Sequence, residues 1–336
     1  SIPTKEIRGI YCNIDYPNLI YVDKENGGKS DALNAGINVS SYPLFACLDA
    51  DSRIEPDALL KLSTEFLKNT DTVVAGGLVR IANGFKIKDG ISSEFSMPSK
   101  MVERFQIVEY YRSFLSGRVS WGATNSMLIV SGAFGVFKKQ AVIEAGGYKT
   151  NTIGEDMEIV VRIHKIIFCE DAVCWTQGPL SLNDIRSQRR RWQIGLFDTL
   201  LSHKSMLLNP RYGTVGLLAI PYHWIFELFG AVVEVLGYFI IPFSLVMGEL
   251  NMFFFIIYFL LAVLLGVILS IGSLILEQYT RKSIVSAKQC LSLSLYAILE
   301  NFGYRQIISL FRVEGMLKYR KLRKTWGKIK RKEIEQ

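Results

Sequence analysis

Two aspartates at the end of an apolar run are the first residues whose spacing suggests chemistry. Residues 43–52 read Pro-Leu-Phe-Ala-Cys-Leu-Asp-Ala-Asp-Ser. An apolar run of this length predicts a buried strand over residues 44–48, and alternation along it should point Asp49 and Asp51 the same way. Two carboxylates at the carboxyl end of a strand predict a Mg²⁺ or Mn²⁺ site, because these cations prefer oxygen ligands and bind phosphate. The alternative is a strand end with two solvated acids.

A glycine loop upstream carries a lysine that can meet phosphate. It reads Gly-Gly-Lys-Ser over residues 27–30 and follows a short predicted strand, residues 19–22. The nucleotide-triphosphatase phosphate loop needs a glycine where this chain has Asp23, so we exclude that motif. Lys29 can still bind phosphate from such a loop, and the alternative is a solvated lysine. The helix that follows should end at Gly36.

Glu155 and Asp156 form a second acidic pair at the start of a helix predicted to run from Met157 to about His164. Acids in a first helical turn are favoured by the helix dipole, and this alone could explain the pair without a catalytic role. In a catalytic role, either carboxylate could serve as a general base. A strand predicted from Ile166 follows without turn residues, so we expect residues to be missing near His164.

Residues 184–193 are rich in cations. On a helix, Gln188, Arg191 and Trp192 share one face. Arginine binds a diphosphate through two parallel hydrogen bonds, and tryptophan offers a flat surface to a sugar ring. A basic helix against a membrane surface is the alternative. Residues 194–208 then alternate apolar and polar at helical period, as expected of an interfacial helix.

Apolar patterning and turn residues predict the elements that hold these side chains in place. They are helices over residues 56–67 and 101–117, strands over 73–81 and 129–137, and a polar hairpin or loop over 84–100.

The apolar residues are concentrated after residue 212. Hydrophobic residues make up 49% of the 336-residue chain, and the mean hydropathy is +0.22. Residues 252–276 are long and apolar enough to span a bilayer, residues 213–248 are longer but contain acids, and residues 287–310 are weaker. Glu227 and Glu234 lie seven apart on one helix face, so we expect them to face protein or to mark the membrane interface.

Charge and cysteine content limit the partners. The net charge is +8, and basic residues cluster between Lys318 and Lys332. A basic tail after apolar segments predicts a cytoplasmic flank that contacts anionic lipids, and we exclude nucleic acid as a partner on that ground. Five cysteines without a C-x-x-C pair indicate a reducing compartment, and three scattered histidines offer no zinc site.

The motifs stand in a fixed order: Lys29 on its glycine loop, Asp49-Ala50-Asp51, Gly154-Glu155-Asp156, and Gln188-Arg189-Arg190-Arg191-Trp192. Followed by apolar segments, this series resembles the membrane-embedded family 2 glycosyltransferases. That family includes the cellulose, chitin, hyaluronan and poly-N-acetylglucosamine synthases, of which the last group and its bacterial relatives are the most similar.

The resemblance implies an α/β GT-A fold on the cytoplasmic face of the cell membrane and inverting transfer from a nucleotide sugar, usually UDP-linked. By the family pattern, Asp49 and Asp51 bind nucleotide and metal, and Asp156 is the general base. Lys29, Gln188 and Arg191 bind the donor, and Trp192 binds the acceptor, a growing β-linked polysaccharide or a lipid-linked glycan. A non-catalytic membrane protein that uses this fold for binding is the alternative.

We expect four regions: a cytoplasmic GT-A domain over residues 1–193, an interfacial helix and linker over 194–212, membrane or interfacial helices over 213–312, and a basic cytoplasmic tail over 313–336. The strand that carries the family's earlier aspartates has no counterpart after Ser1, so we also expect the fold to be incomplete at its amino-terminal end.

Overall fold

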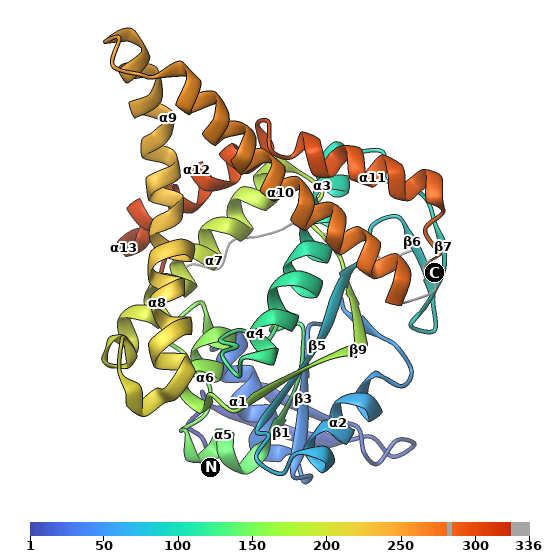
Figure 1. Cartoon of the computed structure of the whole chain (residues 1–336). Coiled ribbons are helices and arrows are strands. Elements are labelled where there is room, and N and C mark those ends of the chain that lie inside the picture. The colour runs from blue at the N-terminus through green and yellow to red at the C-terminus, as the bar shows by residue number, and fades with distance from the viewer. Residues whose placement is uncertain (281–283, 324–336) are drawn as a thin grey trace.

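The computed structural model describes residues 1–280 and 284–323. The part of the predicted basic tail that follows Arg323 therefore lies outside the described residues. Figure 1 shows the central sheet and its helices at one end, and a pair of long helices that project away from it.

Five strands form the central mixed sheet. Their order is β3 (Leu44–Leu48), β8 (Phe134–Lys138), β5 (Val74–Ile81), β9 (Ile166–Thr176) and β4 (Arg53–Ile54). β5 and β9 run parallel, and the other neighbours are antiparallel. Every residue of β5 is buried, and Gly77 within it faces the Phe134 ring, which an added Cβ would approach to 2.4 Å. The predicted strand over residues 44–48 is confirmed, so Asp49 directly follows a strand of the sheet, but its predicted burial is wrong, because β3 is an edge strand in which only Cys47 is buried.

Short helices flank the sheet (Figure 1). They are α1 (Lys29–Val39), α2 (Ala58–Lys68), α5 (Lys139–Glu144) and α6 (Glu155–Ile163). The predicted end of α1 at Gly36 is wrong, because the helix continues to Val39 and Ser40 closes it by donating its N–H to the Gly36 carbonyl. A single glycine inside a helix weakens it without ending it.

Two smaller strand pairs lie outside the central sheet. β1 (Ile7–Cys12) pairs with β2 (Ile20–Lys24), the strand predicted near residues 19–22. β6 (Phe85–Lys88) and β7 (Ile91–Phe95) form the predicted polar hairpin. After it come α3 (Met101–Tyr111), the π-helical turn η1 (Arg112–Arg118) and α4 (Val119–Ala123).

The turn from α6 into β9 needs only two residues. His164 adopts a left-handed conformation with φ 42°, and its N–H bonds to the Val160 carbonyl at 2.8 Å. The chain then enters β9, where Ile166 pairs with Val74. A left-handed residue after the last turn is a common way to end a helix, so the geometry does not require the missing residues expected here.

The carboxyl-terminal half is helical. Its helices are α7 (Leu182–Ser202), η2 (Lys204–Met206), η3 (Pro210–Tyr212), η4 (Val215–Ala219), α8 (Ile220–Tyr222), η5 (His223–Phe229), α9 (Gly230–Val246), α10 (Met252–Thr280), α11 (Ala287–Leu299), α12 (Tyr304–Leu317) and α13 (Tyr319–Leu322). Two stretches are long and apolar enough to cross a membrane, Val215–Val246 and Met252–Tyr279. The weak segment at 287–310 is divided between α11 and α12 by a turn at Gly303, where φ is 105°.

α7 continues across the boundary expected at residue 193. Leu196 and Leu200 are buried with Met157 and Val161 of α6. This part of the helix therefore packs its apolar side against protein.

α12 fixes α7 from the other side. Glu314 of α12 accepts two hydrogen bonds from Arg186, both 2.7 Å, and one of 3.2 Å from Arg190. Gly315 lies against the Arg190 backbone, which an added Cβ would approach to 3.0 Å. The helix that carries the Gln188–Trp192 motif is thus held by ion pairs and by close backbone contact.

Glu227 and Glu234, the acids of the first apolar stretch, face α12. This agrees with the first of the two alternatives given above, that they face protein. Arg312 pairs with the Glu227 carboxylate at 3.1 Å and also bonds Gln193 of α7 at 2.8 Å. Ser309 donates to Glu234 at 2.5 Å. Charged groups in apolar helices usually find such protein partners, because lipid offers none.

Buried ion pairs also attach α10 to the amino-terminal half of the chain. Glu277 of α10 pairs with Arg80 of β5, and both side chains are almost fully buried. Arg112 of η1 donates to Ser270 of α10 at 2.5 Å and pairs with the buried Glu300. The second apolar stretch therefore ends in contacts with the sheet.

Candidate active site

Lys29 is the centre of the candidate site. It is the first residue of α1 and follows Gly28, whose φ is 86°. Its Nζ lies 2.7 Å from Asp49 Oδ1 and 3.6 Å from Glu155 Oε1. Burial alone would lower the pKa of Lys29, but Asp49, Glu155 and Asp156 together raise it above the ordinary lysine value. The ammonium group is therefore held charged among three acids that come from two separate parts of the chain.

Asp49 and Asp51 lie in the turn between β3 and β4. The Ser52 N–H closes this turn on the Asp49 carbonyl at 2.9 Å, and both carboxylate oxygens of Asp51 are buried. Among the described residues, no group of three or more histidine, cysteine or acidic side chains could hold a metal ion. Mg²⁺ is commonly bound by one or two carboxylates together with substrate phosphates. The two aspartates therefore do not form a complete metal site themselves, and a hard cation here would need further oxygen ligands, such as those of a phosphate.

The acidic pair begins α6 where that helix touches α7. A Cβ added to Gly154 would lie 2.7 Å from the Cα of Gly195 in α7, so only glycine allows this contact. Glu155 is 3% exposed, whereas Asp156 is half-buried. Burial, and then the negative charge of Asp156, raise the pKa of Glu155 to about 7, and Lys29 and Arg191 oppose that rise.

The backbone N–H and carbonyl of Gly132 connect Asp156, a candidate base, to Lys29. The Gly132 N–H donates to Asp156 Oδ2 at 3.2 Å, and its carbonyl accepts from Lys29 at 3.2 Å. The Met157 N–H donates to the other Asp156 oxygen at 2.8 Å. A Cβ on Gly132 would lie 3.0 Å from Asp156 Oδ2 and 3.2 Å from Lys29 Nζ, so a side chain here would push one of these groups aside. The sequence indicates close backbone approach near residue 132 but not this bridge.

One small cavity joins these groups. It is lined by Lys29, Leu33, Cys47, Val130, Ser131, Gly132, Phe137, Tyr148, Glu155 and Asp156. Of the predicted site residues, the structure thus brings Lys29 and Asp156 into one cavity and places Asp49 in contact with it through Lys29. Cys47 Sγ lies 3.4 Å from the Tyr148 hydroxyl in the wall, and burial raises the pKa of this thiol to about 11.

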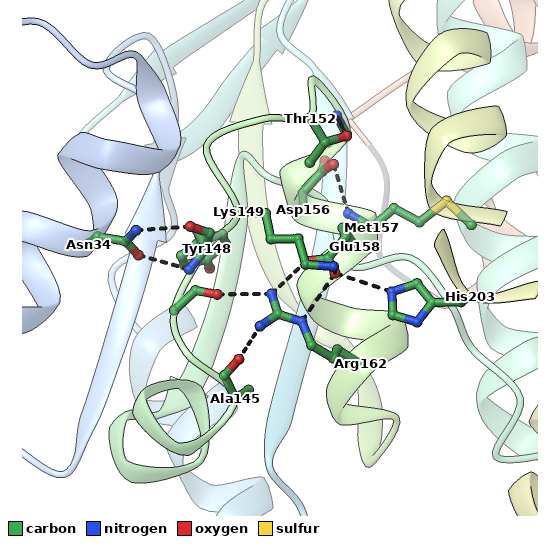
Figure 2. Close-up of polar contacts among 12 residues, drawn as sticks. Asn34, Ala145, Tyr148, Lys149, Thr152, Asp156, Met157, Glu158, Arg162 and His203 are labelled. Atoms are coloured by element: carbon green, nitrogen blue, oxygen red, sulfur yellow. Dashed lines mark hydrogen bonds and ion pairs between the residues drawn. The ribbon is translucent and has the colours of Figure 1, made fainter. Parts of the chain in front are cut away.

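A buried glutamate anchors α6 behind the site, as Figure 2 shows. Glu158 is 1% exposed and pairs with Lys149 at 2.7 Å, Arg162 at 2.5 Å and His203 at 3.1 Å. Burial would raise the pKa of Glu158, but hydrogen bonds from these three groups lower it to about 2. Only the Arg162 partner, four residues along α6, could be read from the local sequence, because Lys149 comes from the preceding loop and His203 from the far end of α7.

A second anchor ties α1 to the same loop. The Asn34 side chain donates to the Tyr148 carbonyl at 2.9 Å and accepts from the Tyr148 N–H at 2.8 Å (Figure 2). This pair of hydrogen bonds fixes the helix that begins with Lys29 to the loop that precedes the acidic pair.

The Gln188–Trp192 motif lies on α7, next to this cavity but outside its lining. Arg191 is near enough for its charge to lower the pKa of Glu155. Gln188 is buried, with 8% exposure, and Trp192 is 44% exposed. The arginine thus approaches the acidic pair, and the tryptophan presents a ring to solvent.

The raised pKa of Glu155 predicts a pH dependence of stability. An acid whose folded pKa of about 7 exceeds its unfolded value of 4.5 stabilises the fold fully below pH 4.5. That contribution is lost as the pH rises through 7. Glu155→Gln should therefore melt like the wild type near pH 5 and be more stable at pH 8, by up to about 3 kcal/mol. Melting temperatures measured from pH 5 to 8 test this.

The exposed carboxylate Glu25 provides the control, because Glu25→Gln should leave the melting curve parallel to that of the wild type. A Glu155→Gln curve that also stays parallel at every pH would contradict the assigned burial of this charge.

Comparison with known proteins identifies the family of this chain. The glycosyl transferase family group 2 matches residues 44–271, which is more than half of the chain. Poly-beta-1,6-N-acetyl-D-glucosamine synthase of Staphylococcus aureus (strain COL) is 30% identical over 197 residues, covering 57% of this chain and 44% of the synthase. The Staphylococcus epidermidis synthase is 31% identical over 186 residues, covering 54% of this chain and 42% of that protein.

The matched region thus spans less than half the length of these relatives. Among solved structures, the mannosyltransferase PcManGT of Pyrobaculum calidifontis, in complex with GDP-Man and Mn²⁺, aligns with a TM-score of 0.49 and 14% identity, covering 88% of this chain and 68% of that one. The family match includes both the D-x-D turn and the α6–α7 contact. The chain belongs to the glycosyl transferase family group 2, and its mixed sheet flanked by helices agrees with the α/β GT-A fold expected from that family.

Proposed function

We propose that this family 2 glycosyltransferase transfers N-acetylglucosamine from a UDP donor onto a growing β-linked polysaccharide at a bacterial cell membrane, with inversion at the sugar carbon. The observation that carries the proposal is the convergence of Lys29, Asp49 and the acidic pair around the Gly132 peptide. The sugar is taken from the names of the staphylococcal relatives, and the UDP donor from the family resemblance.

Asp156 is the general base of this proposal. An acceptor hydroxyl oxygen attacks the anomeric carbon as the bond from that carbon to the diphosphate oxygen breaks, and the hydroxyl proton passes to Asp156. Such a base must lie within hydrogen-bond reach of the hydroxyl. The raised pKa of Glu155 would also suit a base, but that carboxyl is buried and faces Lys29. The half-buried Asp156 is the more accessible of the two, and two backbone N–H groups hold it.

The donor side supplies cations for the leaving diphosphate. Lys29 and Arg191 both lie near Glu155, so their charges can reach a diphosphate bound beside the acidic pair. Asp49 and Asp51 would hold Mg²⁺ or Mn²⁺, which when bound neutralises charge that develops on the leaving group. Gln188 completes the donor set that we propose.

The proposed membrane location rests on the two apolar stretches. No lysine or arginine lies between residues 213 and 280, and the two apolar stretches are joined by residues 247–251 alone. A hairpin of two crossings therefore returns the chain to the side on which it began. The catalytic half, α11 and α12 then share the cytoplasmic side, and the divided segment at 287–310 lies at the interface.

Asp156→Asn tests the chemistry separately from binding. The amide keeps the size of the side chain but cannot take a proton at neutral pH, so transfer should fall by about a hundredfold or more while donor binding is retained. Release of UDP from UDP-N-acetylglucosamine and donor affinity are measured on the full-length protein in membranes. Equal loss of donor binding and transfer would show that Asp156 is structural, and transfer by Asp156→Asn at the wild-type rate would exclude it as the base.

Gly132→Ala tests the bridge between base and lysine. The new Cβ must displace Asp156 or Lys29, so kcat should fall by about tenfold to a hundredfold, with donor KM changed less than about twofold. Gly36→Ala is the matched control, because a Cβ there meets no atom within 4 Å. A Gly132→Ala enzyme with the kcat of the control would show that the bridge does not position the base.

A further inference from the structure

The indole of Trp192 is already covered on one face. The guanidinium carbon of Arg189 lies over the ring, 4.3 Å from its centroid. Arg189 is 6% exposed, whereas Trp192 keeps 44% of its surface accessible. A cation over an aromatic face is attracted by the ring electrons, and the attraction strengthens where water is excluded. The tryptophan to which the family resemblance gives the acceptor role therefore has one occupied face.

A buried network holds Arg189 in that place. Glu109 of α3 forms an ion pair with Arg189 through its Oε1, at 2.8 Å. Its Oε2 accepts from the Gln106 amide at 2.8 Å and from the Tyr304 hydroxyl at 3.3 Å. Tyr304 belongs to α12, and its ring stacks on Phe105 at 4.6 Å between centroids. The position of the guanidinium is thus set by residues of α3 and α12, both remote in sequence.

Only arginine satisfies both contacts at once. Its planar guanidinium can stack on a ring while its edge donates to a carboxylate, whereas the ammonium group of lysine is a compact charge without a plane. A sugar ring packs on an aromatic side chain through one of its two faces. The occupied face is therefore closed to the acceptor, and the orientation of the other face depends on the network.

We propose that Arg189 is a positioning residue, which covers one face of Trp192 so that the acceptor sugar packs on the opposite face, and that Glu109 and Tyr304 hold Arg189 in place. This inference rests on the proposed role of Trp192 in acceptor binding. It makes the contact between Arg189 and Trp192 on α7 a determinant of acceptor specificity. Residues of α3 and α12 hold that contact in place.

The experiment compares Arg189→Lys with Arg190→Lys, the matched control one residue along the same helix. Arg190 pairs with Glu314 at 3.2 Å. The probe is a β-1,6-linked N-acetylglucosamine pentasaccharide, whose binding to the full-length protein is measured by calorimetry without donor and then as acceptor KM. Arg189→Lys should raise both the acceptor Kd and the acceptor KM by about fivefold or more, with donor KM unchanged. Arg190→Lys should stay within about twofold of the wild type.

A double-mutant cycle shows whether Arg189 acts through the indole. In a Trp192→Ala background, Arg189→Lys should weaken pentasaccharide binding no further, because the contact it supports is gone. Tyr304→Phe is the second variant, since it removes one hydroxyl and keeps the ring on Phe105. It should weaken binding about twofold or more in the wild type and not in Trp192→Ala. This variant decides the question if Arg189→Lys lowers the melting temperature.

Two results would overturn the inference: an Arg189→Lys protein that binds the pentasaccharide as Arg190→Lys does, or losses that add fully in the Trp192→Ala background. A wild-type protein that releases UDP but binds no N-acetylglucosamine oligosaccharide would overturn the proposed acceptor, and this inference with it. Binding that is present but indifferent to Arg189 overturns the inference alone.

Discussion

The attraction between one ammonium group and three carboxylates organises the site. Lys29 contacts Asp49 and Glu155 directly, and the Gly132 peptide links it to Asp156. Without that cation, three acids from β3, α6 and their surroundings would repel each other in a partly buried space, where like charges are costly. The same lysine can exchange a carboxylate for a phosphate oxygen. In the proposed function, the arrangement is therefore stable without donor and prepared to receive one.

A second constraint is the position of α7, because the site and the apolar helices share it. At its middle, α7 meets the start of α6 through Gly154 and Gly195. Along its other side, α12 holds it through Glu314 and Arg312, and Arg312 also bonds Glu227 in the first apolar stretch. The helix with the Gln188–Trp192 motif is thus fixed both to the start of α6, with its acidic pair, and to the segment that we place in the membrane.

Much of the fold follows from local patterns. Apolar runs and turn residues identified β3, β5, α2 and the β6–β7 hairpin, because these features depend on near neighbours in sequence. The convergence of the site residues could be inferred only from the order of motifs in a known family. The contact of Lys29 with Gly132 spans 103 residues, and no spacing rule reaches that far. The contacts of Glu158 with Lys149 and His203, the His164 turn and the extent of α7 were missed for related reasons. In α7, helical periodicity shows an apolar face without showing whether protein or lipid covers it.

The most direct test of this account is the affinity for Mn²⁺ measured by electron paramagnetic resonance, with and without saturating UDP. In the structure Asp49 is paired with Lys29, and the described residues offer no set of three metal-binding side chains. The account therefore predicts weak binding of Mn²⁺ alone and binding on the order of tenfold tighter or more with UDP, which Asp51→Asn abolishes. Equal Mn²⁺ affinity in the presence and absence of UDP would contradict it.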